Sequence, residues 1–210
     1  FAHWLSPLPQ PVLAAIILVA VSSLIKPTAI LYLYRVDRTE FYIALSVVLG
    51  VLTSGLLRGI LIGVIISIVL LMKRAARPKV AELGRIPDTD TFSELLHHPT
   101  AQTISDTLIL RVESGLLYFN IDYVRDTISD TIQKHQPQPS NVIIDLSATP
   151  YIDHQAALTL AEFADELKAK GIQLSALEAH ANVRLKLETL GLDHRLGREN
   201  PKLRIADLLS

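Results

Sequence analysis

The stretch of sequence that decides the fold is NVIIDLSATPYIDHQAA, residues 141–157. Its apolar start, from Val142 to Ile144, is continuous rather than alternating, which predicts a strand buried on both faces of a sheet. Apolar residues then recur at the spacing of one helix face and end at a C-cap glycine, in the order Ala156, Leu160, Phe163, Leu167 and Gly171. A buried strand followed by an amphipathic helix predicts an α/β domain.

Further strands and helices are expected on both sides of this stretch. Residues 107–113 and 116–119 predict two strands joined by a short turn, together a β-hairpin. Residues 121–132 predict a helix that ends before Pro137. Toward the C-terminus we expect a strand, a helix ended by a glycine and a short last helix, indicated in turn by Ile172, Leu174 and Ala176, by Val183, Leu187, Leu190 and Gly191, and by residues 205–209. This order predicts a mixed β-sheet with helices packed on it.

The first part of the chain differs in charge and hydropathy from the part just described. Half of the 210 residues are hydrophobic, and the long apolar stretches lie before residue 80. Residues 1–79 have a net charge of +6 and residues 80–210 one of −7. The chain has no cysteine, which excludes a disulfide framework, thiolate metal sites and a cysteine nucleophile. We therefore predict a membrane part followed by a water-soluble domain.

Two apolar stretches are candidates for the membrane part, residues 11–25 and residues 41–72. A single helix over the second stretch would be about 48 Å long, well beyond the about 30 Å of a bilayer core. Two short helices that meet near Gly55 and Gly59 are therefore expected. Arg58 lies at this point, and the interpretation we favour is an arginine that extends to the outer interface, rather than a functional charge within the membrane.

Glycines recur along the second apolar stretch and allow two interpretations. They provide either close helix packing, which we favour, or flexible points in a moving element, and they are Gly50, Gly55, Gly59 and Gly63.

Basic residues predict the orientation in the membrane. They follow the first and the last apolar stretch, so the positive-inside rule places both connections and the C-terminal domain in the cytoplasm; the residues are Lys26, Arg35, Arg38, Lys73, Arg74, Arg77 and Lys79. Residues 27–38 contain Tyr32 and Tyr34 and predict a short interfacial helix. Residues 82–90 contain glycine, proline and charges that argue against regular structure. The predicted division is transmembrane segments at 1–79, a tether at 80–91 and the cytoplasmic domain at 92–210.

Several motifs in serial order resemble a known family. They are LPQPVLAAII at 8–17, GVL at 50–52, GILIGV at 59–64, RPKVAELGRIP at 77–87 and IDLSATPYID at 144–153. The chain resembles the SulP family of sulfate and related anion permeases, and its second half resembles a STAS domain, which is shared with anti-sigma-factor antagonists. The fold that this implies is a set of α-helical transmembrane segments followed by an α/β STAS domain.

The resemblance also implies a function. It is that of the C-terminal part of a secondary anion transporter, working by symport or exchange, in which the STAS domain regulates, dimerises or stabilises the protein. The expected partners are the lipid bilayer, a second copy in a homodimer, the anion and a cytoplasmic protein. In this family the anion binds between half-helix N-termini, expected upstream of residue 1, so we predict no substrate-binding residue here. The alternative is a stand-alone, membrane-anchored STAS domain that acts as a protein-binding module.

The candidate regulatory site is formed by Asp153, His154 and Gln155. In anti-sigma-factor antagonists a serine in this loop is phosphorylated by a partner kinase, and His154 and Gln155 have no hydroxyl that could serve that switch. Asp153 is expected to cap the following helix, with contact to a protein partner as the alternative role. A metal or acid–base role for His154 is disfavoured, because no second histidine or carboxylate cluster has ligand spacing. We expect no catalytic site, cofactor or nucleic-acid partner.

Overall fold

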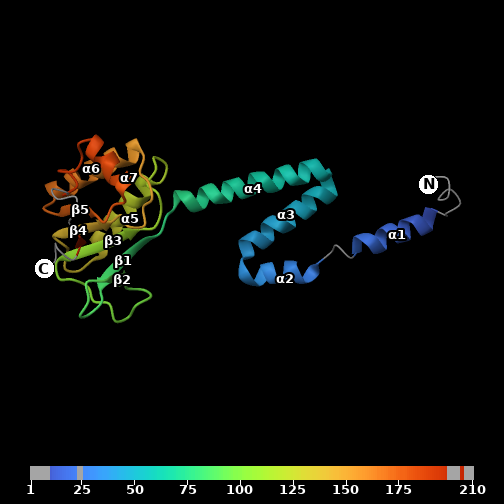
Figure 1. Cartoon of the computed structure of the whole chain (residues 1–210), viewed down its shortest axis with the longest axis horizontal. Helices are drawn as coiled ribbons and strands as arrows, with labels where there is room; N and C mark the ends of the chain where they lie inside the picture. Colours follow the sequence, from blue (N-terminus) through green and yellow to red (C-terminus); the bar gives the residue numbers. More distant parts are fainter. Residues whose placement is uncertain (1–9, 23–25, 198–203, 206–210) are drawn as a thin grey trace. The chain divides into compact units, whose positions relative to one another are not determined.

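The structure is a computed structural model that describes residues 10–22, 26–197 and 204–205. The chain divides into two units, residues 1–70 and residues 71–210, and each unit is described by itself. Figure 1 shows the helices and strands in chain order.

The first unit contains helices α1 (Gln10–Ser22), α2 (Pro27–Val36), α3 (Arg38–Ser54) and most of α4 (Leu56–Ala76). Pro27 is the first residue of α2, where its fixed φ suits a helix start. Asp37 caps α3 and accepts a hydrogen bond from the Thr39 N–H at 2.7 Å. Gly55 separates α3 from α4 with a φ of 85°, a conformation that favours glycine. The prediction of two helices that meet near Gly55 is confirmed. Residues 23–25 of the first expected span lie outside the described residues.

Helices α3 and α4 approach each other through their glycines. A Cβ atom on Gly59 would lie 2.3 Å from a Val51 methyl, and one on Gly63 would lie 2.3 Å from a Val47 methyl. Such distances leave no room for any other residue type. Close packing is therefore the correct interpretation of these two glycines. Arg58 lies exposed in the first turn of α4, three residues after Gly55.

One helix in the described part of the chain, α4 with 21 residues, is long and apolar enough to cross a membrane. At 1.5 Å per residue it extends about 31 Å, close to the thickness of a bilayer core. Helix α1 is apolar but shorter, and α3 has 17 residues.

The second unit is built on a five-stranded mixed sheet in the order β2-β1-β3-β4-β5. The strands are β1 (Val80–Arg85), β2 (Phe92–Glu94), β3 (Thr107–Val112), β4 (Asn141–Asp145) and β5 (Gln173–Leu177). Strand β1 pairs antiparallel with β2 and β3, whereas β3, β4 and β5 are parallel. The α/β domain and its mixed sheet are as predicted.

Helices α5 (Ile121–Lys134), α6 (His154–Ala169) and α7 (Ala181–Thr189) lie over the same face of the sheet (Figure 1). Val142 and Ile144 of β4 point into the core beneath them. Ile143 points to the opposite face, where Leu83, Ile109, Leu177 and Ile205 surround it. Each such buried side chain stabilises the fold by about 1.5–3 kcal/mol. The prediction that this strand is buried on both faces is confirmed.

The predicted hairpin over residues 107–119 is wrong. Leu116 pairs instead with Ile152 in an isolated parallel bridge, which lies beyond the end of β4. The Leu116 N–H donates to the Tyr151 carbonyl oxygen, and the Asp153 N–H donates to the Leu116 carbonyl oxygen, both at 3.0 Å. Because a distant segment satisfies these groups, residues 117–119 form a turn rather than a strand.

The expectation of irregular structure from residue 82 is also wrong for the first residues of the predicted tether, because β1 extends to Arg85. Gly84 is needed within this strand, since a Cβ atom there would lie 2.8 Å from the Gln102 carbonyl oxygen.

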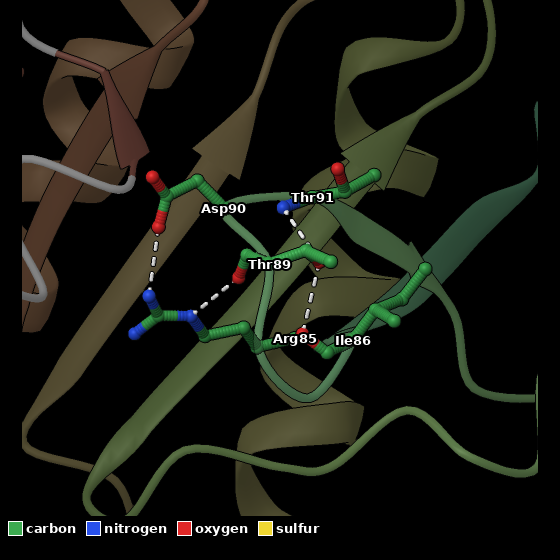
Figure 2. Close-up of polar contacts among 5 residues, drawn as sticks. All are labelled: Arg85, Ile86, Thr89, Asp90 and Thr91. Carbon is green, nitrogen blue, oxygen red and sulfur yellow. Dashed lines mark hydrogen bonds and ion pairs between the residues drawn. The ribbon is translucent and has the colours of Figure 1, made fainter.

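The turn after β1 is held by its own polar groups (Figure 2). The Arg85 Nε donates to the Thr89 carbonyl oxygen at 2.9 Å, and its guanidinium pairs with Asp90 at 2.7 Å. The Thr89 hydroxyl donates to the Ile86 carbonyl oxygen at 3.0 Å.

The predicted helix ends at Gly171 and Gly191 are confirmed, with φ values of 79° and 66°. The expected last helix at 205–209 falls outside the described residues except for Ile205.

Candidate functional site

Asp153 lies at the N-cap of α6 and joins two segments of the domain. Its Oδ1 accepts a hydrogen bond from the Ala156 N–H at 2.7 Å, which satisfies one of the free donors of the first helical turn. Its Oδ2 accepts from the Tyr118 N–H at 2.8 Å. The capping role predicted from the sequence is confirmed, and the same carboxylate also holds the turn that precedes α5.

His154 and Gln155 form the start of α6, and both are exposed. Neither has a hydroxyl group, so this loop offers no serine for phosphorylation. No group of three or more histidines, aspartates or glutamates in the described part of the chain is arranged to hold a metal ion. Contact of residues 153–155 with a protein partner stays a prediction.

Asn120 was not predicted from the sequence; it is 1% exposed and connects the turn at residues 117–120 to the end of α4. Its side-chain amide donates to the Ala75 carbonyl oxygen at 3.1 Å and to the Gly115 carbonyl oxygen at 3.0 Å. Its Oδ1 accepts from the Leu117 N–H at 2.8 Å. The sequence feature that could have identified Asn120 is a polar residue directly before a predicted amphipathic helix. In the structure, however, the Asn120 side chain does not cap that helix.

The second missed feature is an ion pair on the sheet face opposite the helices. Arg111 and Asp145 are register partners on β3 and β4, and Arg111 Nε donates to Asp145 Oδ2 at 2.7 Å. The Asp145 side chain is only 2% exposed, and that of Arg111 is 29% exposed. The other oxygen of Asp145 accepts from the Ser147 N–H at 2.8 Å. The two side chains satisfy each other and bind strands β3 and β4 together.

A third charged group lies where the chain enters β1. Lys79, directly before β1, places its Nζ 2.7 Å from Glu94 at the end of β2 and 3.7 Å from Glu113 after β3. The hydrogen bond from Lys79 lowers the pKa of Glu94, and the same bond raises the pKa of Lys79. Both side chains reach solvent, so this group stabilises the junction only modestly.

These groups connect segments of the domain. The Asp153 and Asn120 side chains connect the loop before α6, the turn before α5 and the last turn of α4. The described residues thus form a polar junction, and His154 and Gln155 are exposed beside it.

The family model of the STAS domain matches residues 98–206, more than half of the chain. The chain belongs to the STAS domain family. It is homologous over almost its whole length to sulfate transporters, in agreement with the resemblance to SulP permeases. Strands β1 and β2 precede the matched residues but hydrogen-bond into the same sheet.

Two plant relatives give the extent of the similarity. The chain is 31% identical over 209 residues to the probable sulfate transporter 4.2 of Arabidopsis thaliana, an alignment that covers 95% of this chain and 31% of that protein. It is 29% identical to the low affinity sulfate transporter 3 of Stylosanthes hamata, with 95% and 32% covered. The chain thus spans about a third of the length of these relatives.

Solved structures show the same fold. The murine Solute Carrier 26 family member A9 (Slc26a9) anion transporter in the inward-facing state matches with a TM-score of 0.74 at 23% identity, covering 90% of this chain and 30% of that one. A second structure of SLC26A9 matches with a TM-score of 0.69 at 20% identity, covering 87% and 31%.

Proposed function

We propose that the chain is the C-terminal part of a secondary anion transporter that carries sulfate or a related anion by symport or exchange. The observation that carries the proposal is the alignment with sulfate transporters, which runs through the apolar helices as well as the STAS domain. A similarity confined to the STAS domain would have favoured a separate binding module. The anion-binding residues are expected in the part of those transporters to which this chain does not align.

The apolar helices α1, α3 and α4 lie in the membrane, and the STAS domain lies in the cytoplasm. The length and composition of α4 support this proposal, as do Lys73 and Arg74 in its last turn. Helix α2 lies at the interface, where Tyr32 and Tyr34 are exposed to 68% and 43%.

The STAS domain regulates or stabilises the transporter, which is a homodimer, and residues 153–155 are the contact for a cytoplasmic partner. The exposure of His154 and Gln155 beside a rigid capping aspartate supports this role, because a binding surface needs a fixed backbone and free side chains.

Transport is tested by uptake of labelled sulfate into vesicles that contain the full-length transporter, with sulfate analogues and dicarboxylates as competitors. Deletion of residues 78–210 removes the whole sheet, including β1, and is compared with the double substitution His154→Ala and Gln155→Ala. We expect the deletion to abolish uptake or to lower the measured mass below that of a dimer. The double substitution should change both quantities less. Vesicles that take up no labelled anion above protein-free vesicles would refute the proposal.

The topology is tested with single cysteines, because this chain has none of its own. Cysteine in place of Ser54, next to the turn between α3 and α4, should react with a membrane-impermeant maleimide added to intact cells. Cysteine in place of His154 should react only after permeabilisation. Labelling of the His154 position in intact cells would contradict a cytoplasmic STAS domain.

A further inference from the structure

Two aromatic side chains are exposed on the turn formed by residues 117–120, which we name the aromatic turn. Tyr118 is 68% exposed and Phe119 is 39% exposed. Their rings contact each other edge to face, with centroids 5.5 Å apart. Tyrosine combines an apolar ring with a polar hydroxyl, and side chains of this kind are enriched where a protein meets a membrane–water interface.

The aromatic turn is fixed to the last turn of α4. The Asn120 amide donates to the Ala75 carbonyl oxygen at 3.1 Å, and the Leu117 N–H donates to Asn120 Oδ1 at 2.8 Å. On its other side, the Tyr118 N–H donates to Asp153 at 2.8 Å. Because both ends are held, the backbone of the aromatic turn is fixed next to Ala75.

Ala75 lies at the end of a helix whose length of about 31 Å matches a bilayer core of about 30 Å. Lys73 and Arg74 lie in the same last turn, and the exposed Arg77 follows it. Basic residues and tyrosine side chains are both enriched where a spanning helix leaves the hydrocarbon core. The end of α4 and the aromatic turn thus combine the residue types of a membrane interface.

We propose that the aromatic turn contacts the lipid headgroup region of the membrane that α4 crosses, with the Phe119 ring toward the acyl boundary and the Tyr118 hydroxyl toward water. The proposal rests on the proposed function, because it requires α4 to span the bilayer. Zwitterionic lipid is sufficient for this contact, since the rings enter by their apolar surface, and anionic lipid adds the attraction of the nearby basic residues.

Tryptophan fluorescence of the full chain in phosphatidylcholine vesicles tests the contact. The only tryptophan of the chain, Trp4, is first replaced by phenylalanine. Single tryptophans then replace Tyr118, Ile65 in the middle of α4, or Leu185, which is 65% exposed on α7. Each protein is measured in vesicles whose lipids carry bromine close to the headgroup or at the chain ends, with and without phosphatidylglycerol.

We expect the Tyr118→Trp emission to shift to shorter wavelength and to be quenched more by bromine near the headgroup than by bromine at the chain ends. The Ile65→Trp emission should show the opposite order, and the Leu185→Trp emission should not be quenched. Quenching only with phosphatidylglycerol would keep the lipid contact but would refute the statement that zwitterionic lipid is sufficient for it.

The failures of the two proposals are distinguishable. Unquenched Tyr118→Trp beside quenched Ile65→Trp would overturn the lipid contact and leave the membrane placement of α4 intact. A Tyr118→Trp emission that is shifted but unquenched by either lipid would mean that protein covers the turn, which also overturns the contact. Equal quenching at Leu185 would indicate unspecific adsorption of the domain and would overturn the specific contact of the aromatic turn. Unquenched Ile65→Trp would refute the membrane placement of α4 and with it the proposed function.

Discussion

Replacing Asn120 with alanine should destabilise the STAS domain more than any exposed substitution in the same region. The side chain is 1% exposed and makes three hydrogen bonds, to Ala75, Gly115 and Leu117. Each bond contributes about 1 kcal/mol net, so their loss should lower the free energy of unfolding by about 3 kcal/mol. For a domain with an m-value of about 1.5 kcal/mol/M, the urea midpoint should fall by about 2 M.

Two further variants separate the hydrogen bonds from the loss of volume. Asn120→Asp keeps the shape and the acceptor for Leu117 but replaces the donor amide by an acceptor that faces two carbonyl oxygens, so it should be at least as unstable as Asn120→Ala. Asn182→Ala, at an exposed position, should shift the midpoint by less than half as much. Urea unfolding of the full chain in mild detergent, followed by circular dichroism, measures all three. Wild-type stability of Asn120→Asp would refute the reasoning.

Three other predictions concern charges and packing. Glu94→Gln should flatten the fall of stability at acidic pH. The bond from Lys79 lowers the pKa of Glu94 below its usual 4.5, so its stabilisation is complete above that value and is lost as the pH falls through the lowered pKa. Urea midpoints across acidic pH check this, and parallel curves would count against it. Arg111→Met should lower the free energy of unfolding by about 2 kcal/mol, because the Asp145 carboxylate loses its cation. The loss is smaller than for a fully buried pair, since some water reaches the carboxylate. A thermal or urea melt measures it, and an unchanged melt would exclude this. Gly63→Val should open the α3–α4 hairpin to limited proteolysis in detergent, because its new Cβ would lie 2.3 Å from a side-chain carbon on α3; undiminished protection would disprove the close packing.

The elements found from the sequence are those with a strong local pattern. Helix α5 shows its buried face at Ile121, Val124, Ile128 and Ile132, and β4 has an unbroken apolar run. Both patterns arise within one element, so no knowledge of the neighbours is needed to interpret them. The break at Gly55 was equally accessible, because helix length and bilayer thickness are general constants.

The elements that were missed depend on distant segments. Strand β1 has the composition of a turn around Gly84, and its strand conformation follows from pairing with β2 and β3 on both sides. Leu116 alternates like a strand residue, but its partner is Ile152.

The same distinction applies to the candidate site. Capping by Asp153 was predictable, because the N-cap and its helix are adjacent in sequence. Its bond to Tyr118, 35 residues away, and the bond from Asn120 to Ala75, 45 residues away, were not. Sequence patterns therefore identified the candidate loop and not its connection to α4.

The Asn120 bond to Ala75 has a mechanical consequence for the protein. A helix connected to a domain only through its backbone can rotate about that connection. Helix α4 is in addition hydrogen-bonded by the Asn120 side chain one residue before its end. A displacement of the last turn of α4 would strain the hydrogen bond that holds residues 117–120, and next along the chain it would strain the bond from Tyr118 to the carboxylate that caps α6.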